Sequence, residues 1–174
     1  MTVVLDWGGN LLLATWLTVR VALGALALGL VWGLLGASAK LSRSRWLRWI
    51  ANAYTTINRG VPELLIILLA YYGGTVVLTR VVRFVDPSTA NVEIPAMGAG
   101  VFALSLVFGA YAAEVFRGAM LAIPPGQIEA AMAVGMSPWL IFRRIKLPQL
   151  WRFALPGLGN HWISLIKDTS LVSI

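Results

Sequence analysis

The sequence predicts an all-α protein whose helices form a polytopic bundle in a membrane. Three observations predict this class. Of the 174 residues, 59% are hydrophobic, only 12% are charged, and long apolar runs alternate with short basic segments along the chain. A soluble domain of this length would need more polar surface, so a lipid bilayer is the expected solvent.

Crossing about 30 Å of hydrocarbon takes roughly 20 helical residues, and the chain has apolar runs of that length. We expect four of them to be membrane-spanning helices, at residues 11–37, 50–78, 97–123 and 156–174. The fourth run is still apolar at Ile174, with neither a closing loop nor a basic tail after it. This ending predicts a C-terminally incomplete domain.

Basic residues are concentrated in two short segments, 40–48 and 143–152, whereas residues 79–96 balance their arginines with acidic side chains. Cytoplasmic loops are enriched in Lys and Arg, so both basic segments are expected in the cytoplasm. If the spans alternate, residues 79–96 and the N-terminus then lie outside. Trp46 and Trp49 are placed where aromatic side chains mark the cytoplasmic interface.

The composition also excludes several classes of function. The formal net charge is +7, but the basic residues separate apolar runs instead of gathering on one solvated face, so no nucleic-acid partner is expected. With no cysteine and a single histidine, no metal is expected either. No phosphate-binding loop of the type Gly-x-x-x-x-Gly-Lys-Ser/Thr occurs in the chain. We therefore expect no catalytic residues, no bound cofactor and no ATPase activity in this chain itself.

Small residues follow one face of the first expected span. They are Gly24, Gly29, Gly33 and Gly36, and one pair of them forms a GxxxG motif. Such stripes let two helices approach closely in a membrane. The stripe predicts either packing against another helix of the same chain or contact with a second subunit.

Residues 123–148 are too polar to cross the membrane, and their helix start and stop signals predict two short helices. Pro125 suits the first turn of the first helix, and Gly135 can take the left-handed conformation that ends it. Ser137 then caps the second helix, which Pro148 is expected to stop. Small side chains in the first helix would let another protein approach its backbone closely.

This segment carries a recognisable pattern, in which Glu129-Ala130-Ala131 is followed by Gly135 and then by Leu147-Pro148. It resembles the EAA loop of the permease subunits of ABC importers, the cytoplasmic loop that docks on the ATPase subunit. The resemblance implies that the ATPase-coupling residues are Gly126, Gln127, Glu129, Ala130, Ala131, Ala133, Gly135, Ser137, Arg143, Arg144, Leu147 and Pro148.

The resemblance extends over nearly the whole chain from about residue 11, and other segments narrow it. They are residues 59–63, 111–118, 154–160 and 167–173. Together they look most like permeases for polar amino acids, in particular histidine, lysine, arginine, ornithine or opines. The implied fold is that of a type I importer permease, one transmembrane domain over residues 1–174 with the coupling loop at 123–148. The resemblance also implies a fifth membrane helix, which we expect to be missing at the C-terminus of this sequence.

The same resemblance implies a function and a set of partners. The chain would form the pathway for polar, basic amino acids across the bacterial cytoplasmic membrane. ATP and Mg would be used by two copies of a separate ATPase subunit. A second permease subunit, identical or homologous, and an extracytoplasmic amino-acid-binding protein would complete the complex in the lipid bilayer.

Charged residues inside apolar runs are candidate pathway residues, because a charge near the bilayer centre costs about 2.5 to 3.5 kcal/mol on insertion scales. Lys167 and Asp168 are adjacent and lie near mid-membrane if their helix starts at residue 156. They are expected either to gate the substrate pathway or to neutralise each other in a broken helix. The candidate gate or pathway residues are Lys167, Asp168, Thr169, Ser170, Glu114, Arg59 and Glu63.

Helical spacing predicts two further ion pairs. Glu114 and Arg117 are three residues apart, and Arg59 and Glu63 are four apart, so each pair can meet on one helical face. Both pairs are expected to be structural. His161 is interpreted as a hydrogen-bonded residue of the bundle and not as a proton relay.

Two other classes of protein are alternative interpretations of the same membrane pattern. An ion-coupled secondary transporter would show an internal repeat with helices interrupted in matching positions, and no such repeat is evident. A membrane-anchored assembly protein would not need charges within its spans. Both features favour the permease interpretation.

Overall fold

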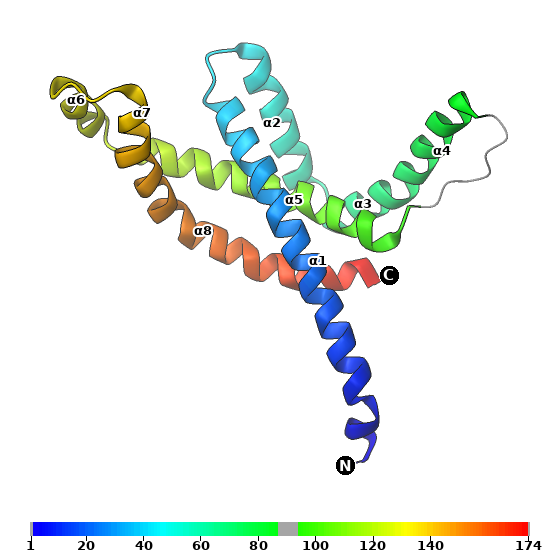
Figure 1. The fold of residues 1–174 in the computed structure, drawn as a ribbon. Coiled ribbons are helices and arrows are strands. Elements are labelled where there is room, and N and C mark those ends of the chain that lie inside the picture. The colour runs from blue at the N-terminus through cyan, green and yellow to red at the C-terminus, as the bar shows by residue number, and fades with distance from the viewer. Residues whose placement is uncertain (1, 87–93, 174) are drawn as a thin grey trace.

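The computed structural model describes residues 2–86 and 94–173, and every regular element in them is a helix (Figure 1). The all-α prediction is therefore confirmed. In chain order the elements are α1 (Thr2–Lys40), α2 (Arg45–Gly60), α3 (Glu63–Leu68), the π-helical segment η1 (Leu69–Gly73), α4 (Gly74–Val85), α5 (Ala96–Leu121), α6 (Pro125–Ala133), α7 (Pro138–Ile141), the π-helical segment η2 (Phe142–Lys146), α8 (Leu147–Asp168) and the 3-10 helix η3 (Thr169–Ser173).

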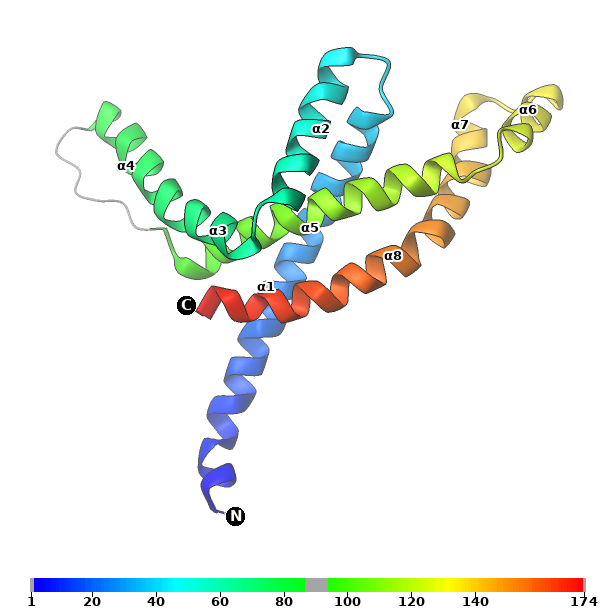
Figure 2. The ribbon, with the colours of Figure 1, turned by 180° about the vertical axis from the view of Figure 1, so that it is seen from behind.

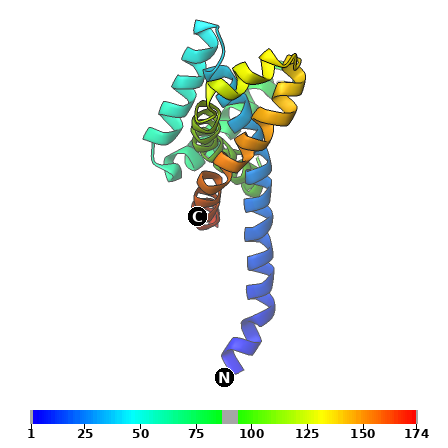
Figure 3. The ribbon, with the colours of Figure 1, turned by 90° about the vertical axis from the view of Figure 1, so that its left-hand side faces the viewer.

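Within the described residues, three helical stretches are long and apolar enough to cross a membrane. They are Trp7–Lys40, Glu63–Phe84 and Ala96–Leu121. The first and third correspond to the first and third expected spans. The second runs without interruption through α3, η1 and α4. At 39 residues α1 is about 58 Å long, and its N-terminal half projects away from the other helices (Figure 3).

The prediction of a second span at residues 50–78 is wrong because the helix is interrupted within this range. At the break Val61 is extended, with φ −100° and ψ 138°, and Pro62 follows it. Proline has no N–H for the helical ladder, and its ring disfavours a helical conformation at the residue before it. As a result α2 ends at Gly60 and pairs with α1 as a hairpin, while a separate spanning stretch starts at Glu63.

The expected end of a helix at Pro148 is also wrong. The helix that starts at Pro138 continues through α7, η2 and α8 as far as Asp168, with Pro148 in the first turn of α8. In a regular α-helix the proline ring would clash with the carbonyl four residues earlier, and the π-helical turn η2 changes that register. Consequently α8 starts at Leu147, nine residues before the expected start at Pro156.

The helix α8, which contains most of the fourth expected span, has 22 residues. It is not among the stretches that are apolar enough to cross a membrane by composition. Arg152, His161, Lys167 and Asp168 interrupt its apolar sequence. Polar residues of this kind are tolerated in membrane proteins where they face other helices or a wet cavity. The position of α8 beside α5 is consistent with that explanation (Figure 2).

Close packing of α1 on α5 forms the centre of the bundle. A Cβ added at Gly33 would lie 2.6 Å from Cβ of Ala112, and one added at Gly29 would lie 2.7 Å from Cδ1 of Phe108. Atoms do not approach that closely, so each glycine is needed for the contact. Of the two interpretations of the small-residue stripe, packing within one chain is the one that the structure supports.

Candidate functional site

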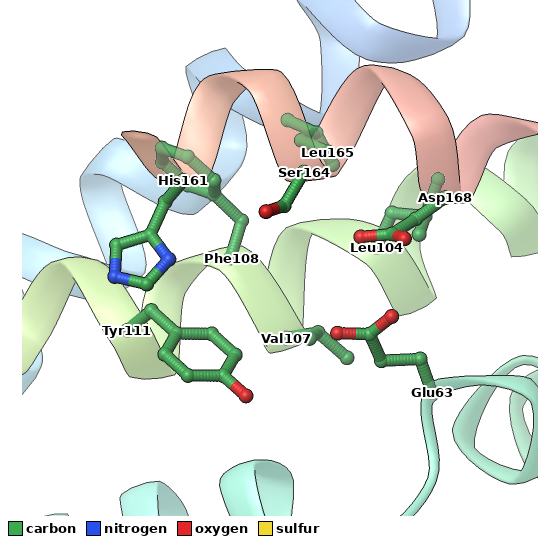
Figure 4. A pocket seen from close by; sticks show the side chains of 9 residues that line it. All are labelled: Glu63, Leu104, Val107, Phe108, Tyr111, His161, Ser164, Leu165 and Asp168. Atoms are coloured by element: carbon green, nitrogen blue, oxygen red, sulfur yellow. The ribbon is translucent and has the colours of Figure 1, made fainter. Parts of the chain in front are cut away.

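A small pocket lies where α3, α5 and α8 meet (Figure 4). Its volume is about 20 Å³, which is room for one water molecule. The residues around it are Glu63, Leu104, Val107, Phe108, Tyr111, His161, Ser164, Leu165 and Asp168. Those from α5 and those from α8 each follow the spacing i, i+3, i+4, i+7, so each helix contributes one face to the pocket.

Two carboxyl groups point toward each other across this pocket. Glu63 comes from the first turn of α3 and Asp168 from the last turn of α8 (Figure 4). Their side chains are close enough to hydrogen-bond. None of the residues that line the pocket is a lysine or an arginine. Two acidic groups at such short range repel each other when both are charged, and a cation between them would relieve the repulsion.

The other end of the pocket is aromatic. The rings of Tyr111 and His161 stack with their centroids 4.6 Å apart. The guanidinium of Arg59 lies over the Tyr111 ring, 5.3 Å from its centre. The contact that the structure gives His161 is therefore stacking and not the expected hydrogen bond.

A second charged cluster surrounds Glu114 next to the pocket. Its carboxylate accepts a hydrogen bond from the Lys40 ammonium at the end of α1 and one from Nε of Arg117, at 2.9 Å. The Arg59 guanidinium at the end of α2 lies 3.8 Å from the same carboxylate. This cluster joins α1, α2 and α5. The predicted pair of Glu114 and Arg117 is confirmed.

The predicted pair of Arg59 and Glu63 is wrong. The break at Val61 and Pro62 removes the continuous helix on which their four-residue spacing depended. Arg59 contacts Glu114 instead, and Glu63 faces Asp168. A helix interruption of two residues therefore places two charges that are close in sequence in different clusters.

Lys167 and Asp168 make no direct ion pair among the described residues, but the Lys167 charge still acts on the Asp168 carboxylate. Consecutive residues of a helix point in directions about 100° apart, and Lys167 is exposed while Asp168 faces the pocket. Thr169 is buried, and its hydroxyl donates to the Ile166 carbonyl at 2.6 Å. Ser170 donates to the Lys167 carbonyl at 2.8 Å. Of these four candidates, Asp168 is the one that lines the pocket.

The local structure of residues 123–148 follows the sequence prediction up to Ser137. The N–H of Gly135 donates to the Met132 carbonyl and that of Met136 to the Ala131 carbonyl, both at 3.0 Å. This is a Schellman ending of α6, and Gly135 has the positive φ of 79° that the motif requires. The Ser137 side chain caps α7 by accepting from the N–H of Leu140 at 3.4 Å.

The exposed surface of this loop differs from the expected one in one residue. Glu129, Ala130 and Ala133 are exposed, but Ala131 is only 5% exposed and packs inside the loop. The sequence pattern alone does not identify which of these small residues is buried. The loop also exposes apolar side chains that the sequence analysis did not single out, namely Met132, Val134 and Trp139.

Two features connect the loop to the pocket. The side-chain amide of Gln149 in α8 donates to the side-chain oxygen of Gln127 in α6 at 2.6 Å, which ties the two arms of the loop together. The helix from Pro138 to Asp168 then runs without a break from the loop to the pocket. Figure 2 shows this helix alongside α5 over much of its length. The loop and Asp168 are therefore at opposite ends of one continuous helix.

The fold and these two regions define a membrane permease subunit, with apolar spanning helices, a polar pocket between them and an exposed loop at one end. The chain belongs to the family of binding-protein-dependent transport system inner membrane components, whose model matches residues 25–174. Members of this family are inner-membrane permeases, and ATP hydrolysis takes place in a separate subunit. This membership disfavours the secondary-transporter and assembly-protein interpretations.

Individual relatives agree with this assignment. The chain is 49% identical to the nopaline transport system permease protein of Agrobacterium fabrum, over 97% of this chain and 71% of the relative. It is 40% identical to the histidine/lysine/arginine/ornithine transport system permease protein of Escherichia coli, over 97% and 73%. A crystal structure of an amino acid ABC transporter with histidines matches with a TM-score of 0.71 and 32% identity, over 94% and 74%.

Proposed function

We propose that this chain lines the translocation pathway for polar amino acids, and that its substrates are basic amino acids or the related opines. The observation that carries the proposal is the pair of carboxyl groups of Glu63 and Asp168, which face one pocket from two helices. A cationic side chain placed between them would relieve their repulsion. The names of the relatives, which include nopaline, histidine, lysine and arginine, support the same substrate class.

A second feature favours an amino acid over a simple cation. Arg59 lies over the Tyr111 ring at the aromatic end of the pocket, and its side chain is 45% exposed. Its guanidinium can form a bidentate contact with a carboxylate. We place the α-carboxylate of the substrate toward Arg59 and its cationic side chain toward Glu63 and Asp168. Tyr111, which lines the same pocket, would lie along the aliphatic part of the substrate.

The pocket must open for transport. Its volume of about 20 Å³ holds a water molecule but no amino acid. The two carboxyl groups come from α3 and α8, so separation of these helices would widen the pocket and move the two acids apart. In this proposal the described conformation is a closed stage of the cycle.

The energy for that movement would come from a separate subunit. We propose that residues 123–148 are the contact with two copies of an ATPase that uses ATP and Mg, and that the unbroken helix from Pro138 to Asp168 transmits its movement to the pocket. A second permease subunit and an extracytoplasmic amino-acid-binding protein complete the proposed complex. The basic segments 40–48 and 143–152 support a proposed orientation with the loop in the cytoplasm and the N-terminus outside.

Uptake by the full-length protein, reconstituted with its partner subunits in proteoliposomes, tests the substrate assignment. We expect arginine and histidine to be transported, and Asp168→Asn to reduce arginine uptake at least tenfold, because a neutral amide no longer attracts a cation. Asp168→Glu is the matched control, since it keeps the negative charge at the same position, and it should retain uptake. Transport of glutamate or a sugar without arginine or histidine would contradict the assignment.

Cysteine crosslinking to the ATPase tests the coupling loop. We expect crosslinks from cysteines at the exposed Ala130 and Ala133, and none from the buried Ala131, which is the internal control. Gly135→Val should weaken docking and uncouple hydrolysis from transport, because a β-branched residue is strained at φ 79°. Gly135→Asn, which tolerates that conformation, should be much milder. Normal coupling in Gly135→Val, with no crosslink from either exposed position, would exclude this contact.

A further inference from the structure

An apolar groove lies between α1 and α2, separate from the pocket of Figure 4. Its volume is about 330 Å³, and its lining is almost entirely apolar. Trp32, Leu35 and Ala39 of α1 form one wall, and Leu47 and Ile50 of α2 form the other. The groove lining extends over eight residues of each helix, or about 10 Å, which suits an extended hydrocarbon chain better than a compact ligand.

Positive charge is concentrated at one end of this groove. The turn between α1 and α2 carries Arg43 and Arg45, both exposed, and it follows Ala39 and precedes Leu47, which line the groove. The turn is ordered by Arg48, whose guanidinium donates to the Ser42 carbonyl at 3.1 Å. The sequence from residue 41 to residue 62 contains no aspartate or glutamate.

The outer surface of α2 indicates what surrounds the groove. Trp46, Trp49, Ile50 and Ile57 are all more than half exposed. Their spacing places them on one side of the helix. A stripe of this kind, with two tryptophans next to a basic turn, is typical of a helix at the boundary between hydrocarbon and lipid headgroups. The groove therefore opens beside lipid.

We propose that this groove binds one anionic phospholipid, with an acyl chain between α1 and α2 and its phosphate at Arg43 and Arg45. The apolar wall suits the acyl chain, and the cationic end suits the phosphate because no acidic residue is nearby in the sequence. The assignment of this lipid to the cytoplasmic leaflet rests on the proposed orientation. The binding itself depends neither on that orientation nor on the substrate.

Native mass spectrometry of the full-length protein tests the proposal. The protein is released from nanodiscs that contain equal amounts of dioleoylphosphatidylglycerol and dioleoylphosphatidylcholine, and the retained lipid is counted. We expect preferential retention of phosphatidylglycerol. Changing Arg43 and Arg45 together to glutamine should lower that retention about tenfold, because each basic residue near a lipid surface contributes to the attraction. The same double change at Arg143 and Arg144 removes equal charge away from the groove and should have no such effect.

A second pair of variants tests the apolar part. Ala39→Phe fills the groove and should abolish preferential retention, whereas Ser38→Phe adds the same ring at an exposed neighbouring position outside the lining and should not. Equal retention of the two lipids by the wild type would overturn the proposal. Displacement of phosphatidylglycerol by inorganic phosphate alone, or unchanged retention in Ala39→Phe, would overturn it as well. No outcome depends on transport, so failure here is distinct from failure of the proposed function.

Discussion

The charged cluster at Glu114 and the acidic pair of Glu63 and Asp168 lie on neighbouring parts of the same bundle, yet their charges are arranged in opposite ways. Glu114 contacts three cations from α1, α2 and α5. Glu63 and Asp168 face each other in a pocket without a lysine or arginine in its lining. The first cluster stabilises the fold through contacts within the chain. The second leaves a repulsion that a ligand can relieve, which is why we place the substrate there.

The largest expected effect follows from the removal of Glu114. In Glu114→Gln the Lys40 side chain, only 7% exposed, loses its carboxylate partner while two arginines remain close. Breaking a buried ion pair in this way costs about 3 kcal/mol or more of stability. We expect poor membrane assembly and a lower melting temperature of the purified protein. Glu129→Gln, at an exposed position, is the control. A melting temperature equal to that of the wild type would show that the cluster does not hold the helices together.

A lysine introduced beside Glu63 and Asp168 should give this acidic pair a cationic partner within the chain, as Glu114 already has. Ser164 lines the pocket four residues before Asp168, so Ser164→Lys places an ammonium group within helical reach of the carboxylate. We expect stability to be kept or raised and basic amino acid uptake to fall at least tenfold. Ser164→Gln, of similar size without charge, separates the effect of charge from that of bulk. Full uptake with Ser164→Lys would exclude a cation-binding role for the pair.

The smallest expected effect is the loss of one exposed cation from the Glu114 cluster. Arg117 is 40% exposed, and Glu114 keeps Lys40 when Arg117→Gln is made. Exposed ion pairs contribute about 0 to 1 kcal/mol, so thermal denaturation should change only slightly. A loss as large as that of Glu114→Gln would show that Arg117, and not Lys40, is the essential partner.

The short-range features of the chain were predictable. Apolar run length identified the helices α1 and α5, and the punctuation by Pro125, Gly135 and Ser137 identified the bend between α6 and α7. Each of these depends on residues within a few positions of one another. The pair of Glu114 and Arg117 belongs to the same class, because both residues lie on one unbroken helix.

Predictions of where a helix continues or ends at a proline were less successful. Pro62 ended a helix that hydropathy would have continued, and Pro148 failed to end one that its sequence context would have stopped. Proline disfavours a helix in both places, but a π-helical turn accommodates the second ring, and such a turn has no simple sequence signal. The charge pairing then changed with the helix boundaries.

The sequence alone was sufficient for the class of fold, the local structure around Gly135 and the family resemblance, because all three depend on composition and on local spacing. The meeting of Glu63 with Asp168, more than 100 residues apart in the chain, was decided by the tertiary structure. So was the burial of Ala131 among its exposed neighbours. Contacts of this kind depend on how whole helices pack, and close packing selects partners by shape and not by distance along the chain.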